Sequence, residues 1–153
     1  MQPEKPNVEI INRWFDEVWN KGRMEAVHEM CTPGVIGHGQ VQHAVDIGLV
    51  EFKQFAESLR TAFPDIRINI QETLAQGDKV AARWNATMTH KGAFLGTAAT
   101  GRKVEVTGTT IVRIVDGKIA EGWDNWDQLG LLVQIGAVPA AQFVAEQKVA
   151  RAS

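Results

Sequence analysis

The hydrophobic period of this chain changes once, near Ile66, and that change limits the folds open to it. Before this point apolar residues recur every three or four positions, which is the spacing of one helix face. After it, Ile66, Ile68 and Ile70 alternate with polar residues, as in a half-buried strand. Helices followed by strands, rather than alternating with them, are typical of an α+β fold with an antiparallel sheet.

The N-terminal part predicts three helices. The first spans about residues 8–20, with Asn7 as its N-cap. A short second helix covers about 24–30, and the third covers about 49–63, where phenylalanines form one stripe before a proline. The Gly- and His-bearing stretch between the second and third helices reads as a loop.

The remainder predicts a meander of strands and a closing helix. Turn-forming residues separate the apolar runs, and they place strands near 66–75, 80–90, 104–115 and 118–126 and a helix near 128–135. There is no linker, repeat or shift in composition, so we expect one domain over residues 1–153, with a core of about 7–138 and an Ala-rich tail over 139–153.

Charge and cysteine content exclude several classes of function. The formal charge of −2 gives no basic field, so we expect neither a nucleic-acid nor a membrane partner. A single cysteine, Cys31, allows no internal disulfide and no thiolate metal cage. The N-terminus lacks the apolar core of a signal peptide, and no run approaches the length of about 20 residues that spans a bilayer. We therefore expect a cytoplasmic protein.

Acid–base chemistry must fall to carboxylates or histidines, because the chain has no tyrosine. In the run from Glu121 to Asp127, burial beside Trp123 and Trp126 would raise the pKa of Asp124. Asp127 precedes the closing helix, where backbone donors lower the pKa of an N-cap carboxyl. Asp124 is therefore the predicted acid/base, and Asp127 is a structural cap or a second acid.

The face on which Asp124 lies depends on the turn at Asp116-Gly117. A strict two-residue turn pairs Val115 with Lys118 and places Asp124 on the odd-numbered face of the sheet. A bulge at Gly117 instead places it opposite Gly108, on the face of the predicted pocket. The sequence leaves both registers open.

Small residues on the predicted concave face favour an apolar pocket, although Trp84 and Met88 would fill the same space. His90, at the end of that face, would reach the pocket rim or be a satisfied strand-end histidine. His38, His43 and Asp46 have metal-ligating side chains, but they fall in the predicted loop without converging spacing, so no metal site is expected.

Several segments, in this order and spacing, resemble the SnoaL-like polyketide cyclase (ester cyclase) family over nearly the whole chain. They are Trp19-Asn-Lys-Gly22, Ala62-Phe-Pro-Asp65, Thr89-His-Lys-Gly-Ala-Phe-Leu-Gly96 with Thr100-Gly101-Arg102, Arg113-Ile-Val-Asp-Gly-Lys-Ile119, Trp123, Asp127, Gly130-Leu-Leu132 and Gln134-Ile-Gly136. The resemblance implies a cone-shaped α+β barrel of the nuclear-transport-factor-2-like (cystatin-like) type. It also implies intramolecular aldol ring closure on a hydrophobic carbonyl compound without any cofactor.

The resemblance assigns the acid/base to Asp124 and, on matching positions, puts Thr110 where the cyclases have a histidine and Gly108 where they have a glutamine. We therefore expect the carboxyl to lack those polar partners. The histidines of the family's strands match His38 and His90. The residues expected to bind substrate are His38, Trp84, Met88, His90, Thr110, Trp123 and Trp126.

Three functions fit these residues. The first is a cofactor-free acid/base enzyme, either a cyclase or a related carbonyl isomerase or lyase. The second is an epoxide hydrolase, which needs two carboxylates and a cation, and Arg113 is the only cation nearby. The third is a non-catalytic binding or dimerisation module. A homo-oligomer, a dimer or tetramer, is expected through the sheet face that carries Asn85, Thr87, Thr109 and Ile111.

Overall fold

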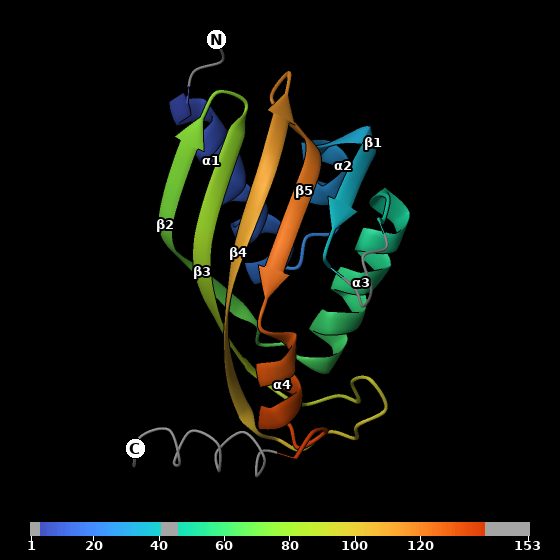
Figure 1. Cartoon of the computed structure of the whole chain (residues 1–153). Coiled ribbons are helices and arrows are strands. Elements are labelled where there is room, and N and C mark those ends of the chain that lie inside the picture. Colours follow the sequence, from blue (N-terminus) through green and yellow to red (C-terminus); the bar gives the residue numbers. More distant parts are fainter. Residues whose placement is uncertain (1–3, 41–45, 140–153) are drawn as a thin grey trace, which may run out of the picture.

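The computed structural model describes residues 4–40 and 46–139, and it shows a curved, open sheet with helices packed on its concave face (Figure 1). The elements in chain order are α1 (Glu4–Trp14), a π-helical continuation η1 (Phe15–Asn20), α2 (Glu25–Met30), β1 (Cys31–His38), α3 (Leu49–Ala62), β2 (Arg67–Gln76), β3 (Lys79–Thr89), β4 (Lys103–Val115), β5 (Lys118–Trp126) and α4 (Gln128–Gln134). The α+β order predicted from the change of period is confirmed.

The sheet has five strands in the order β1-β5-β4-β3-β2. Strands β2 to β5 form the predicted antiparallel meander, whereas β1 pairs with β5 in parallel. The expectation of a loop, drawn from composition, was therefore wrong, whereas the early strand that the resemblance implied at His38 is present as β1. The sheet is mixed. Pro33, Gly34 and Gly37 gave β1 the composition of a loop, but pairing with β5 fixes it as an edge strand.

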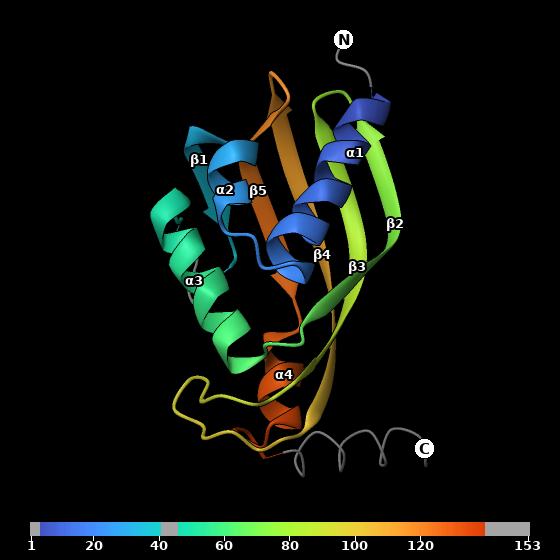
Figure 2. The same ribbon diagram turned by 180° about the vertical axis from the view of Figure 1, so that it is seen from behind.

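Helix α1 begins earlier than predicted. Asn7 lies inside the helix and is buried, and its Nδ2 donates to the carbonyl oxygen of Gly77 at 3.2 Å. It therefore ties α1 to the β2–β3 turn instead of capping the helix. Seen from behind, α1 crosses β2 and β3, while α3 stands beside β1 at the other side of the sheet (Figure 2).

The register between β4 and β5 combines features of both predicted alternatives. Val115 pairs with Lys118 across a two-residue turn in which Asp116 and Gly117 both have positive φ, 49° and 74°. The bulge lies not at Gly117 but one step into β5, because Ile114 pairs with Ile119 while Arg113 pairs with Glu121. Ala120 is thus the extra residue.

This bulge decides the direction of Asp124. Ile119 is buried on the concave face, and strict alternation from Ile119 would turn Asp124 to the convex face. The extra residue reverses the alternation, so that Gly122 and Asp124 both line the concave side. Asp124 pairs with Thr110 and not with Gly108, which corrects the predicted partner.

One hydrophobic cluster fills the space between helices and sheet, with members from Ile11 in α1 to Ile135 after α4. No helix among residues 4–40 and 46–139 is long and apolar enough to cross a membrane. The predicted tail lies outside the described residues beyond position 139.

Candidate functional site

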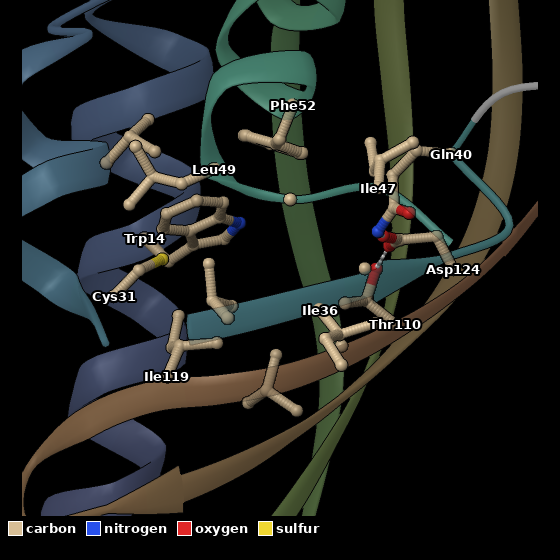
Figure 3. Close-up of a pocket in the computed structure, with 16 residues that line it drawn as sticks. Trp14, Cys31, Ile36, Gln40, Ile47, Leu49, Phe52, Thr110, Ile119 and Asp124 are labelled. Atoms are coloured by element: carbon tan, nitrogen blue, oxygen red, sulfur yellow. Dashed lines mark hydrogen bonds between the residues drawn. The ribbon is translucent and has the colours of Figure 1, made fainter. Parts of the chain in front are cut away.

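Asp124 is the carboxyl that faces the interior of the fold, and two side chains hold it. Thr110 Oγ1 donates a hydrogen bond to its Oδ1, and Gln40 Nε2 donates to its Oδ2. Figure 3 shows the three side chains converging from β4, β5 and the chain that follows β1. Both carboxylate oxygens therefore have a donor, and the plane of the carboxylate is fixed.

Burial raises the pKa of Asp124 from its ordinary value of 3.8 to about 6, and the hydrogen bonds from Thr110 and Gln40 lower it by less than burial raises it. A carboxyl with a pKa near 6 is mostly ionised at neutral pH, yet it is a far better proton acceptor than an ordinary aspartate. Asp124 can therefore take a proton and return it during one turnover.

The hydroxyl of Thr110 is itself held by a hydrogen bond from Trp84. Trp84 Nε1 donates to Thr110 Oγ1 at 3.0 Å, and Thr110 is only 3% exposed. The indole reaches this position because Gly108 lies opposite Trp84 in the β3–β4 ladder. A Cβ at position 108 would approach the ring to 2.4 Å. We had expected Asp124 to lack polar partners, and this expectation was wrong. Gly108 leaves room for the Trp84 indole, which donates to Thr110, and Thr110 in turn donates to Asp124.

Gln40 is the site residue that the sequence did not reveal. It follows Gly39, whose φ of +81° turns the chain, and a Cβ on that glycine would lie 2.1 Å from the carbonyl oxygen of Asp124. The backbone after β1 thus passes directly against β5. Two glycines within four residues, Gly37 and Gly39, are the sequence signal of this close approach.

The carboxyl lies between two hollows, which we call the aliphatic and the aromatic hollow. They enclose about 440 and 510 Å³, including their open sides, and share Trp14, Gln40, Phe52 and Asp124. The side chains that line only the aliphatic hollow include Val27, Cys31, Val35, Ile36, Ile47, Leu49, Val112 and Ile119. Those that line the aromatic hollow and not the aliphatic one include Phe15, Trp19, Phe55, Trp84, Met88 and Trp126.

A wider outer hollow of about 880 Å³, including its open side, continues from the aromatic hollow and shares Gln40, Phe55 and Trp126 with it. Its other walls come from α3, α4 and the segment that carries Phe94 and Leu95. The arrangement provides an entrance lined by mixed side chains and an apolar interior, with one ionisable group where the two inner hollows meet.

The structure brings together Asp124, Trp84, Met88, Thr110 and Trp126 of the residues predicted to form the site. Of the small residues on the concave face, Gly122 lines the aliphatic hollow and Ala86 the aromatic hollow, which Trp84 and Met88 also line.

His38 and Trp123 do not join this group, because neither lines any of the hollows around Asp124. Their rings stack on each other, with centroids 5.3 Å apart. His38 Nε2 lies 2.9 Å from a carboxylate oxygen of Glu121, and Arg113 binds the other oxygen of that group. The hydrogen bond to Glu121 raises the pKa of His38. Beyond the bulge at Ala120, the odd-numbered residues of β5 point away from Asp124, and this places Trp123, with the His38 ring stacked on it, outside the group.

His90 is fully buried and lines none of the three hollows around Asp124. It stacks on Phe63, and its Nδ1 lies 2.9 Å from Thr100 Oγ1, so it packs the base of the loop after β3. The structure therefore places it as a core histidine and not at the pocket rim.

Asp127 is the N-cap of α4, and its Oδ1 accepts a hydrogen bond from the backbone nitrogen of Gly130 at 2.8 Å. His43 lies outside the described residues, and the part of the chain that is described contains no group of three or more side chains that could hold a metal ion.

Three comparisons with known proteins place this geometry among characterised folds. Residues 9–135 match the family model for SnoaL-like polyketide cyclases. The aklanonic acid methyl ester cyclase DauD of Streptomyces sp. strain C5 is 28% identical over 134 residues, which cover 86% of this chain and 82% of that protein. The nogalonic acid methyl ester cyclase of Streptomyces nogalater is 29% identical over 119 residues, covering 77% of this chain and 89% of that protein.

The solved structure of AclR from Streptomyces galilaeus, a candidate hydroxylase, superposes with a TM-score of 0.84 at 25% identity, covering 98% of this chain and 95% of that chain.

Proposed function

The chain belongs to the SnoaL-like polyketide cyclase family, and on that premise we propose that it closes a ring in a hydrophobic polyketide by an intramolecular aldol reaction with Asp124 as acid and base. The observation that carries the proposal is the single carboxyl, with a pKa of about 6, at the junction of two apolar hollows. Relatives that act on methyl esters of aklanonic and nogalonic acid support the substrate class.

The first step needs a base near an acidic C–H group. A carbon between two carbonyls loses its proton readily, and ionised Asp124 accepts that proton on one carboxylate oxygen. The resulting carbanion is delocalised onto the neighbouring carbonyls as an enolate. Thr110 and Gln40 keep the carboxylate in one orientation, so that it meets the C–H group without first having to turn.

The second step forms the carbon–carbon bond. The enolate carbon attacks a carbonyl carbon of the same molecule, and the carbonyl oxygen becomes an alkoxide. Asp124, now protonated, returns its proton to that oxygen, which gives a hydroxyl group and restores the carboxylate. No atom is lost or gained, so the product is an isomer of the substrate with one more ring.

The two hollows supply the remaining requirement, which is folding a flexible substrate until its two carbons meet. Apolar walls on both sides of Asp124 bind the two parts of the substrate by burial of apolar surface. Holding reacting groups in the correct geometry removes much of the entropic barrier to ring closure.

The test is to incubate the protein with aklanonic acid methyl ester and with nogalonic acid methyl ester. We expect a product of unchanged mass with one carbonyl fewer and one tertiary alcohol more, identified by mass spectrometry and NMR. Asp124→Asn should reduce the rate by at least about 100-fold while the protein remains folded. An equal rate for Asp124→Asn and wild type would contradict the role of Asp124.

The epoxide hydrolase alternative finds no support in the geometry. Arg113 pairs with Glu121, with Nε and Oε2 3.2 Å apart, and lines none of the hollows around Asp124. Asp124 is the only carboxylate among the described residues that line the two inner hollows. A pair of carboxylates with a cation between them is therefore absent from this part of the structure.

A further inference from the structure

The carboxamide of Gln40 has one end that the proposed chemistry does not use. Gln40 is 5% exposed and lines all three hollows around Asp124. Its Nε2 donates to Asp124, but its Oε1 is buried and has no hydrogen-bond partner among the described residues. The only other buried side-chain atom of this kind in the described part of the chain is Nε2 of His90, a residue that lines none of the three hollows around Asp124.

The orientation of the amide follows from the charge of its neighbour. An ionised carboxylate only accepts hydrogen bonds, so it requires the nitrogen of Gln40 and repels the oxygen. The amide therefore keeps Nε2 on Asp124, and the atom left over is an acceptor. A buried acceptor without a donor is unfavourable, and a ligand that brings a donor to it removes that cost.

Two glycines allow the amide to occupy this position. A Cβ on Gly37 would lie 2.8 Å from Gln40 Oε1 and 2.9 Å from Nε2, so any larger residue would displace the carboxamide. Gly39 allows the turn that brings Gln40 against β5. The local backbone is thus shaped to place one glutamine side chain at the junction of the two inner hollows.

We propose that Gln40 Oε1 accepts a hydrogen bond from a hydroxyl or enol group of the bound substrate and thereby selects substrates with such a donor beside an apolar ring. The proposal deepens the proposed function, since it concerns the same cavity. It also fixes the substrate's orientation, because a carbonyl oxygen would be repelled from this point and a hydroxyl group attracted.

A pair of simple probes tests this selection without any catalysis. 2-Naphthol and naphthalene share one ring system and differ by one hydroxyl group. We expect wild-type protein to bind 2-naphthol about tenfold more tightly in a ¹H–¹⁵N NMR titration, with the indole signals as reporters. Gln40→Met, which keeps the length of the side chain without the amide, should lose or reverse this preference while still binding naphthalene.

Two further variants complete the design. Gln76→Met makes the same change at an exposed position outside the three hollows around Asp124 and should keep the wild-type preference. Gly37→Ala keeps the glutamine at position 40, but the added methyl group displaces its carboxamide. This variant should lose the preference for 2-naphthol, as Gln40→Met does.

The outcomes separate this inference from the proposed function. If wild-type protein shows no preference for 2-naphthol, or if Gln40→Met keeps the preference, the inference about Oε1 is wrong even when the methyl esters are cyclised. If the preference depends on Gln40 but neither ester is cyclised, the inference stands and the proposed reaction on these esters fails.

Discussion

Thr110 and Asp124 face each other across the β4–β5 ladder, and the hydroxyl of Thr110 donates to the carboxylate of Asp124. The same hydroxyl accepts the indole N–H of Trp84. An indole, a hydroxyl and a carboxylate thus form one chain of hydrogen bonds in the cavity wall, and Gln40 closes the chain on the other carboxylate oxygen.

Replacing Thr110 should make Asp124 harder to ionise. The hydrogen bond from Thr110 lowers the pKa of Asp124, so Thr110→Val should raise that pKa above its wild-type value of about 6. A ¹³C NMR titration of the Asp124 carboxyl would measure the change. Thr110→Ser keeps the hydroxyl and should restore the wild-type pKa; a value for Thr110→Val at or below that of wild type would refute the role of this hydrogen bond.

The ionised carboxylate of Asp124 should lower the stability of the folded protein above pH 6. The pKa of Asp124 is about 6 in the folded protein against about 3.9 in an unfolded chain, so the folded state binds the proton more tightly. The stabilisation that this tighter proton binding gives the folded state is fully present below about pH 4 and is lost as the pH rises through about 6. The difference corresponds to at most about 3 kcal/mol.

Asp124→Asn removes the charge and should therefore increase the free energy of unfolding at pH 8 by about 1–3 kcal/mol, less the hydrogen bonds that the amide fails to make. Urea unfolding of both proteins at pH 8 and pH 4 would measure the effect, which should shrink toward pH 4. An advantage of the variant that stays constant across this range would show that Asp124 is not perturbed by burial.

Gly108 should be essential for the position of Trp84. A methyl group at residue 108 would lie 2.4 Å from the Trp84 ring, so Gly108→Ala should lower the free energy of unfolding by about 1–3 kcal/mol through overpacking. The matched control is Gly122→Ala on β5, where the nearest atom lies 3.8 Å from the added carbon. Equal losses in the two variants in urea unfolding would contradict the close approach of Trp84 and Gly108.

The homo-oligomer expected from the sequence stays a prediction with a defined surface. Leu74, Ala81, Ile111 and Trp123 follow one another across four strands on the convex face, and Leu74 and Ile111 are 68% and 38% exposed. Light scattering should give at least a dimer, and Ile111→Lys should weaken it. A wild-type monomer at all concentrations would contradict this expectation.

The sequence predicted the class of fold well, because the change of hydrophobic period at Ile66 is a local signal. It also indicated Asp124, which lies in a recognisable strand, and the cap at Asp127, which directly precedes a recognisable helix. Strand β1 was missed because its composition is that of a loop, and its pairing with β5 is a long-range interaction.

The direction of Asp124 and its contact with Gln40 depend on two features that leave only weak signals in the sequence. A bulge at Ala120 changes which face Asp124 occupies, yet nothing in the run from Ile119 to Trp126 marks the extra residue. Gln40 is brought to Asp124 across 84 positions of sequence, and only the glycines before it hint at the close approach.

The central claim is that Asp124, ionised with a pKa of about 6, is the base that starts ring closure. The measurement that tests it most directly is the pH dependence of kcat/KM for cyclisation, which reports groups of the free enzyme. We predict that kcat/KM falls tenfold per pH unit below about pH 6 in the wild type. A value of kcat/KM that stays constant down to pH 4.5 would contradict the claim.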